Sequence, residues 1–269
     1  MSVRFRIEIS ARRGTIAWVD LHGAARGVAY GLLRSQDPAL AETLHDAGWM
    51  GSSLRPLGLS CPQFRKASGG HGRYATSPVG SIWFGSPIPQ IATSLLAGVS
   101  SRKEIMWGAT PLRIEGVHVE NADSWTQSRS SREMSETASP SDATAGVEAE
   151  PRPAVDRAVA LVEAGREVAL VSATPVLVKY DSRFIGPDHP EYAARILHNL
   201  RHKADLLGLA GPERVRVIRG GRLRQFSLAK GTAFGAHVTV GVTAPTEFVT
   251  AIRDWGLGLS TVQGFGWIR

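Results

Sequence analysis

Cysteine is almost absent from this sequence, since Cys61 is the only one in 269 residues. A single cysteine excludes a disulfide framework and a cysteine-rich zinc site, and it fits the reducing cytoplasm. No apolar run approaches the roughly 20 residues that a membrane-spanning helix needs. The histidines and acids show no spacing typical of metal ligands. We therefore expect a cytoplasmic protein with no membrane segment, no metal and no cofactor.

Acidic residues are in the minority, with 24 Asp and Glu against 31 Lys and Arg, a net charge of +7 and a pI of about 10.1. A basic excess of this kind is typical of proteins that bind nucleic acids, although it also promotes solubility. The planar guanidinium of arginine suits bidentate contacts to phosphate. Basic residues concentrate in one segment, whose candidate RNA-binding residues are Arg195, Arg201, Lys203, Arg214, Arg216, Arg219, Arg222, Arg224 and Lys230.

Large apolar residues are scarce between Asp123 and Pro153, where Ser, Thr, Glu, Ala and Pro dominate. Such a segment cannot bury enough apolar surface to offset the entropy of ordering it. We expect a flexible insertion at about residues 121–165.

The two halves of the chain resemble each other in pattern. The first ten residues alternate apolar and charged side chains, as in a half-buried strand, and a helix is expected over 23–34. A second helix begins at Asp37-Pro38, and its start resembles the helix that Asp188-His189-Pro190 opens in the second half. Later, a strand, a proline break and a helix occur in both halves, with the helices over 89–96 and 246–255.

This order of elements predicts an α+β fold. Each half reads strand–helix–strand–strand–helix–strand, which is the plan of a ferredoxin-like (RRM-like) domain with an antiparallel sheet. We place the N-terminal domain at residues 1–112 and the C-terminal domain, which includes the insertion, at 113–269.

A glycine-rich loop over residues 256–266 contains two Gly-x-Gly pairs around five residues that lean polar. Glycine lets backbone N–H groups approach a phosphate closely, because no Cβ intervenes. A dinucleotide-binding fingerprint would follow the first strand and open a helix, whereas these glycines follow a helix and precede a strand. The loop therefore contacts a sugar–phosphate backbone or simply makes a tight turn.

The pattern Gly-Leu-Gly-(five residues)-Gly-Phe-Gly resembles the signature loop of the CRISPR-associated endoribonucleases that cut repeat RNA into guide RNAs, a branch of the RAMP superfamily. The run Arg26–His45, the segment Arg55-Pro-Leu-Gly-Leu-Ser60 and the segment Ser172–Lys179 also resemble that family. The resemblance spans most of the chain except residues 120–165. It implies two ferredoxin-like domains, and the length of the insertion and an arginine-leaning site favour the plasmid-associated type IV branch.

The resemblance also implies a reaction. The 2′-OH of RNA attacks the adjacent phosphate without a metal and leaves a 2′,3′-cyclic phosphate, which needs a base, an acid and cations for the phosphorane charge. The implied partners are a CRISPR repeat stem-loop, retained after cleavage, and other subunits of a CRISPR effector complex.

Three candidate catalytic residues follow from the resemblance. His45 stands where one branch of the family keeps a catalytic histidine, and imidazole titrates near neutral pH. Tyr30 aligns with a catalytic tyrosine, and Arg55 stands at the place of a catalytic lysine. The alternatives are a histidine that interacts with a helix C-terminus and a tyrosine that belongs to the core. Arginine can hold phosphorane charge but does not readily exchange a proton.

Further candidates compete with these. His22 lies near the position of the histidine in other branches, just before the expected first helix. Arg26 and Arg34, two helical turns apart, could form an arginine-lined site that acts by positioning and charge. The glycine-rich loop lacks a basic residue between its glycine pairs, so the basic segment would supply charge for its candidate RNA-binding residues Gly256, Gly258, Ser260, Thr261, Gln263, Gly264 and Gly266.

Two binding proteins are the rival interpretations. The first is a non-catalytic subunit that binds guide RNA in a CRISPR effector complex. The second is a general RNA-recognition-motif protein, which would carry exposed aromatic side chains on its sheet. With 7% aromatic residues, we expect no such platform in this chain.

Overall fold

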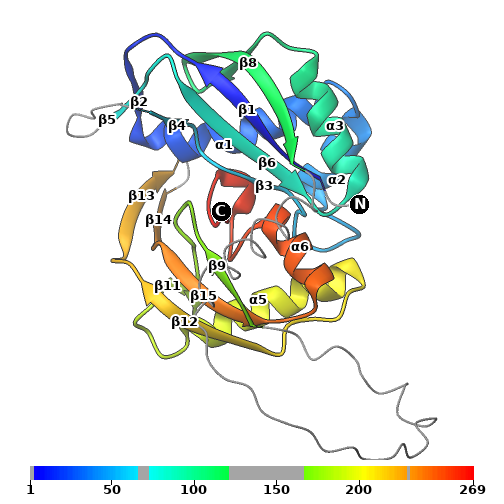
Figure 1. Cartoon of the computed structure of the whole chain (residues 1–269), viewed down its shortest axis with the longest axis vertical. Coiled ribbons are helices and arrows are strands. Elements are labelled where there is room, and N and C mark those ends of the chain that lie inside the picture. Colours follow the sequence, from blue (N-terminus) through cyan, green and yellow to red (C-terminus); the bar gives the residue numbers. More distant parts are fainter. Residues whose placement is uncertain (1–2, 66–72, 121–166, 229–230) are drawn as a thin grey trace, which may run out of the picture.

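Two antiparallel sheets, each with helices packed on one face, lie one above the other in the molecule (Figure 1). The computed structural model describes residues 3–65, 73–120, 167–228 and 231–269. In these ranges, no helix is both long enough and apolar enough to cross a membrane. The predicted insertion at 121–165 lies outside the described residues, as does Lys230.

The N-terminal sheet is built around β1, whose alternating apolar residues Phe5, Ile7 and Ile9 are fully buried on the helical side. Both neighbours of β1 run antiparallel to it. In spatial order, the strands are β3 (Gly58–Leu59), β6 (Gly80–Ser86), β1 (Val3–Ser10), β8 (Thr110–Glu120) and β7 (Glu104–Trp107), with β4 (Gln63–Phe64) also paired to β6. A small ribbon of β2 (Thr15–Ala17) and β5 (Arg73–Ala75) lies beside it.

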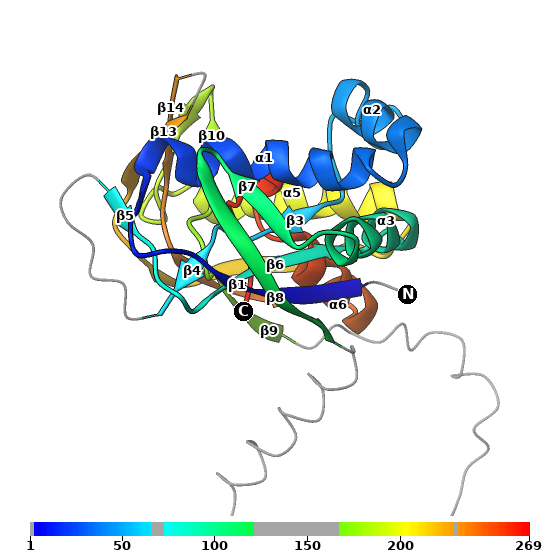
Figure 2. The ribbon, with the colours of Figure 1, turned by 90° about the horizontal axis from the view of Figure 1, so that it is seen from above.

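Three helices cover that sheet on one face (Figure 2), namely α1 (Trp18–Arg34), α2 (Pro38–Asp46) and α3 (Pro89–Ser100). Helix α2 begins as predicted, because the Asp37 side chain caps it by accepting a hydrogen bond of 2.9 Å from the Leu40 amide. Helix α1 begins at Trp18 rather than at the expected Gly23, so His22 lies inside the helix and not before it.

The C-terminal sheet has the same plan. Its strands are β12 (Arg214–Gly220), β15 (Val238–Thr243) and β9 (Glu167–Val171), with α5 (Tyr192–Leu207) and α6 (Thr246–Trp255) packed on it. Ile268 makes an isolated bridge to Ser172 beyond β9 and takes the place of the fourth strand. Two hairpins complete the lobe, one formed by β10 (Lys179–Tyr180) and β11 (Arg183–Phe184) and the other by β13 (Arg224–Leu228) and β14 (Gly231–Gly235).

The prediction of an α+β fold with two ferredoxin-like domains is confirmed, because each sheet has its first strand between its third and fourth. The division at residue 112 falls inside β8, which pairs with β1 along most of its length. The N-terminal sheet therefore includes residues up to Glu120, and we correct the boundary accordingly.

The glycine-rich loop joins the two lobes. Val262, in the short 3₁₀ helix η1 (Thr261–Gln263), belongs to the N-terminal core, whereas Leu257 and Ile268 belong to the C-terminal core. The end of α6 is pressed against the N-terminal sheet, since a Cβ atom on Gly58 would lie 2.5 Å from the Trp255 carbonyl oxygen. This contact places the loop that follows α6 between the lobes.

Candidate functional site

The glycines of the loop are required by its packing. Gly264 has a φ of +81°, and a Cβ atom there would lie 2.6 Å from Cys61 Sγ. Gly258 has a φ of +67°, and its Cβ would lie 2.6 Å from the Leu177 carbonyl oxygen. The four glycines expected to bind RNA are all buried, so we correct the expectation that they contact RNA directly; these glycines are Gly256, Gly258, Gly264 and Gly266.

Between the glycine pairs, the loop presents few groups to solvent. Ser260 is exposed and Gln263 is half-buried. Thr261 is buried, and its hydroxyl donates a hydrogen bond of 2.8 Å to the Leu57 carbonyl in the N-terminal lobe. Thr261 therefore anchors the loop, while Ser260 and Gln263 are the polar side chains that remain accessible.

One face of the loop forms a cavity of about 330 Å³, which we name the glycine-loop pocket. The described residues that line it include three cations and no acid, an arrangement that favours an anion. The lining consists of Arg26, Ser53, Leu54, Arg55, Lys203, Trp255 and the residues 258–263.

Arg55 links the pocket to the end of α2. Its Nε and Nη2 donate hydrogen bonds of 2.8 and 2.7 Å to the carbonyls of Leu44 and His45, and Nη1 donates one of 2.8 Å to the Ser53 carbonyl. These carbonyls lie in and just after the last turn of α2, where intrahelical partners run out. The guanidinium is thereby held in one orientation beside the pocket.

His45 and Tyr30 lie together near the end of α2, beside Arg55. The ring of Tyr30 meets that of His45 edge-on at 5.3 Å, and the Tyr30 hydroxyl donates to the Leu44 carbonyl at 3.2 Å. Burial raises the pKa of Tyr30 above its ordinary value. His45 is 48% exposed, and its Nδ1 lies 2.6 Å from Asp46 Oδ1. A hydrogen bond from Nδ1–H to Asp46 leaves Nε2 as the proton acceptor.

The two arginines of α1, Arg26 and Arg34, differ in their surroundings. Arg26 lines the glycine-loop pocket, and its guanidinium carbon lies 5.5 Å from the centre of the Tyr30 ring. Arg34 is exposed at the end of α1 and lines none of the described cavities. The structure therefore brings together His45, Tyr30, Arg55 and Arg26, and leaves Arg34 apart.

His22 occupies the opposite side of the loop and is almost fully buried. Its ring stacks on Phe265 at 3.9 Å, and its Nδ1 lies 3.0 Å from the Gln263 carbonyl and 3.3 Å from Cys61 Sγ. Burial lowers the pKa of His22 to about 4, so the ring is neutral at physiological pH. A neutral, stacked and enclosed imidazole holds the loop in place, and His22 lies within α1 rather than before it, while its catalytic role stays a prediction.

The basic segment divides into paired and free-standing residues. Arg201 donates to the carbonyls of Pro212 and Glu213, and Arg216 forms an ion pair with Glu167. Arg195 is half-buried over the Tyr180 ring, at 4.7 Å. Exposed arginines on β12, on β13 and between them are Arg214, Arg219, Arg222 and Arg224.

Lys203 does not lie on the exposed face of α5. It is 1% exposed, and its Nζ donates a hydrogen bond of 2.8 Å to the Gly256 carbonyl. Direct binding to an RNA phosphate, as expected from sequence, is therefore corrected to a contact with the glycine-rich loop.

A larger cavity of about 870 Å³, which we name the interdomain cleft, opens between the lobes on the His22 side of the loop. Trp18, which is 45% exposed, and Tyr74 pack edge-to-face there at 5.7 Å. The described lining holds no acid, and its aromatic and arginine side chains are Trp18, Tyr74, Trp83, Phe226, Trp267, Arg4, Arg219, Arg224 and Arg269. Of these rings only Trp18 is exposed, and it lies on helix α1 rather than on a sheet, so the expectation that the sheet carries no exposed aromatic platform stays a prediction.

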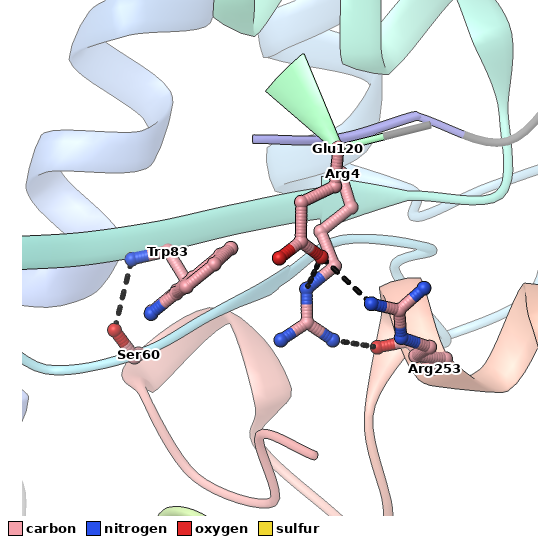
Figure 3. A network of polar contacts seen from close by, with 5 residues as sticks. All are labelled: Arg4, Ser60, Trp83, Glu120 and Arg253. Carbon is pink, nitrogen blue, oxygen red and sulfur yellow. Dashed lines mark hydrogen bonds and ion pairs between the residues drawn. The ribbon is translucent and has the colours of Figure 1, made fainter. Parts of the chain in front are cut away.

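An ion network links the two lobes beside the cleft, and Arg4 belongs both to this network and to the lining of the cleft (Figure 3). Arg4 and Arg253, from β1 and α6, contact the same Glu120 oxygen at 3.2 and 2.7 Å. The Arg4 guanidinium lies between the rings of Trp83 and Trp267, at 4.8 and 4.4 Å from their centres. Burial and the neighbouring Arg253 lower the pKa of Arg4 to about 10, which leaves it charged at neutral pH. The network fixes the two lobes relative to each other.

Comparisons with known proteins point to one fold. No protein-family model matches the chain, and no curated protein sequence matches it. Among solved structures, a Cas6-related protein from Pyrococcus furiosus has a TM-score of 0.70 at 12% identity, with 100% of this chain and 98% of that chain covered. A CRISPR-associated Cas6 protein has a TM-score of 0.67 at 13% identity, with 100% and 99% covered.

A third solved structure is a RAMP protein described as binding different RNA substrates. It has a TM-score of 0.68 at 12% identity, with 99% of this chain and 98% of that chain covered. The agreement spans both lobes in each case, including the loop that joins them. The chain therefore has the fold of the Cas6 and RAMP proteins.

Proposed function

We propose that the protein is a CRISPR-associated endoribonuclease that binds repeat RNA and cleaves precursor guide-RNA transcripts. The observation that carries the proposal is the convergence of His45, Tyr30, Arg26 and Arg55 beside the glycine-rich loop. Arg26 and Tyr30 come from α1, His45 from α2 and Arg55 from the segment after α2, and the two arginines line a cavity whose described lining contains no acid. The fold shared with Cas6 proteins supports the same assignment.

The reaction we propose is attack of the RNA 2′-OH on the adjacent phosphate, with a 2′,3′-cyclic phosphate as one product. His45 is the base, because its Nδ1 is engaged by Asp46 and its Nε2 is left to accept the 2′-OH proton. Arg26 and Arg55 offset the charge of the phosphorane. Tyr30, whose hydroxyl keeps its proton because burial raises its pKa, packs against His45 and is the proposed source of a proton for the departing 5′-oxygen.

Two surfaces of the protein are available to bind the parts of the RNA that lie away from the scissile phosphate. The exposed arginines of β12 and β13 suit the phosphates of an A-form stem, and the rings of the interdomain cleft suit unpaired bases. Extensive contacts of both kinds would also retain the cleaved product. Binding to other effector subunits, and the type IV assignment, stay predictions from the sequence.

The alternative is a RAMP subunit that binds guide RNA without cutting it. Arg55 favours this alternative, since an arginine stands where the family resemblance implies a proton-exchanging lysine, and each of its three nitrogens already donates to a backbone carbonyl. In that case the glycine-loop pocket would bind a phosphate without turnover.

One experiment separates the two functions. The protein is incubated in EDTA with the repeat RNA of its host, and in parallel with the same RNA carrying a 2′-deoxy sugar at the cut. We expect cleavage of the first RNA, a cyclic phosphate end, and no cleavage of the second. Tight binding of both RNAs without cleavage of either would support the non-catalytic subunit, and cleavage of the 2′-deoxy RNA would exclude 2′-OH attack.

A further inference from the structure

Lys203 is a fully buried basic residue, only 1% exposed. Lysine is almost never fully buried unless it is paired, because the ammonium loses its hydration. Its Nζ donates a hydrogen bond of 2.8 Å to the Gly256 carbonyl and lies 4.9 Å from the centre of the Trp255 ring. Burial lowers the pKa of Lys203 to about 7. A leucine or methionine would fill this place at lower cost, so the ammonium has a specific task.

The group that Lys203 holds is the peptide that begins the glycine-rich loop. The carbonyl of the Gly256–Leu257 peptide accepts from Nζ, and its N–H donates a hydrogen bond of 2.8 Å to the Gly266 carbonyl. Both polar groups of this one peptide are therefore engaged. Its carbonyl binds Lys203 of α5, and its N–H binds Gly266 at the other end of the loop. Gly256 itself has a φ of +97°, a conformation that needs such support.

The residues that follow this peptide form the wall of the glycine-loop pocket. Gly258 to Gln263 line it opposite Arg26 and Arg55, and Lys203 and Trp255 line it as well. A change at the start of the loop would shift Ser260, the most exposed residue of the wall, relative to the two arginines. Small displacements of this kind cost much more in rate than in affinity.

We propose that Lys203 is a positioning residue, whose buried ammonium fixes the Gly256–Leu257 peptide and so sets the loop wall of the glycine-loop pocket. Its effect on RNA cleavage rests on the proposed function, whereas its effect on the loop does not. The role differs from phosphate binding, because Nζ is enclosed and already engaged by a carbonyl.

The test uses two substitutions of the full chain. Lys203→Met removes the donor at similar volume, and Lys203→Gln keeps an uncharged N–H donor on a side chain one bond shorter. His202→Met, on the neighbouring exposed position of α5, is the matched control. For each variant, we would measure amide hydrogen exchange at Leu257, the Kd for repeat RNA and the single-turnover cleavage rate in EDTA.

We expect Lys203→Met to increase exchange at Leu257 about tenfold or more and to slow cleavage by about 10- to 100-fold, with the Kd within about threefold of the parent. Lys203→Gln should restore both properties to within about fivefold, and His202→Met should change neither.

The proposal is overturned if exchange at Leu257 is unchanged in Lys203→Met, or if Lys203→Gln is as impaired as Lys203→Met, since a hydrogen bond from this side chain would then not be what holds the peptide. A loss of affinity equal to the loss of rate would overturn it in favour of RNA binding. If the parent protein does not cut RNA, the proposed function fails, and the exchange data still decide the role of Lys203. If Lys203→Met does not fold, Lys203→Leu takes its place.

Discussion

The glycine-loop pocket and the interdomain cleft are both lined by residues of the two lobes, yet they offer different chemistry. The pocket has a volume of about 330 Å³ and presents guanidinium groups and an ammonium, with His45 and Tyr30 at its edge. The cleft has a volume of about 870 Å³ and presents five aromatic rings together with arginines. The first suits one phosphate and its ribose, and the second suits several stacked bases.

Helix α1 contributes to both sites and therefore sets their spacing. Trp18 and His22 in its first turns face the cleft, and Arg26, one turn later, lines the pocket. The difference teaches that the two sites can be altered independently, so under the proposed function RNA binding and RNA cleavage should respond to different substitutions. We make four predictions from this separation. Each concerns one of the two sites or the contact of His22 with the glycine-rich loop.

The largest effect is expected in the pocket. His45→Ala should lower the single-turnover cleavage rate by about 10²- to 10⁴-fold, because it removes the proton acceptor, while the Kd for repeat RNA changes little. Cleavage of bound RNA in EDTA measures this. His118→Ala is the matched control, since its side chain is 52% exposed against 48% for His45. Cleavage by His45→Ala at the parent rate would move the chemistry to the arginines.

The stability of the packing between His22 and the glycine-rich loop should depend on pH. The folded-state pKa of His22 is about 4, below its ordinary value of 6.5, so between these values the unfolded chain binds the extra proton. The free energy of unfolding should therefore fall as pH decreases from 6.5 to 4, by up to about 3 kcal/mol from this residue. Urea unfolding of the parent and of His22→Gln measures it, and the variant should show a shallower pH dependence. Equal slopes would contradict the assignment.

In the cleft, removal of an exposed ring should weaken binding without slowing the reaction. Trp18→Ala should raise the Kd for repeat RNA by about 5- to 100-fold, the equivalent of about 1–3 kcal/mol for one stacked base. Alanine is a good helix former, so α1 should persist. Met106→Ala, at a residue 51% exposed outside the cleft, is the control. A slower reaction of bound RNA in Trp18→Ala would show that the sites are not separable.

The smallest effect concerns the arginines at the mouth of the cleft. Arg219→Gln and Arg224→Gln should each lower the salt dependence of RNA binding by about 0.7 to 0.9 in the slope of log K against log[salt], as expected for one lost phosphate contact. Titrations at several salt concentrations measure the slope. Arg34→Gln, at an exposed arginine distant from both sites, should leave the slope unchanged.

The sequence predicted the fold well where local signals agree with tertiary packing. The Asp37-Pro38 helix start and the helix over Thr246–Trp255 both occur in the structure. The family resemblance singled out Tyr30, His45 and Arg55, and the structure places them together, although their roles stay predictions. The glycines of the loop were open to two interpretations, and only the contacts across the lobes explain them by packing.

The residues that sequence reasoning misplaced depend on packing between distant segments. His22 was expected in a loop, because the apolar pattern of α1 is strongest after Gly23, and only Phe265 and Cys61 explain its burial. A signal did exist for Lys203, which follows Ile196 and Leu200 at the spacing of the buried face of α5. The aromatic cleft was missed because its rings come from a helix, several strands and the chain's last residues, which only the tertiary fold brings together.

The hydrogen bond between His22 and the Gln263 carbonyl joins residues separated by 241 positions. Contacts of such long sequence separation form late in folding, because closing so large a loop costs entropy before any contact compensates for it. In a refolding time course, helical signal from both lobes should therefore return before the pocket and the cleft exist. A chain with two correctly formed lobes that have not yet docked would lack both cavities, so under the proposed function RNA binding would report on complete folding of the protein.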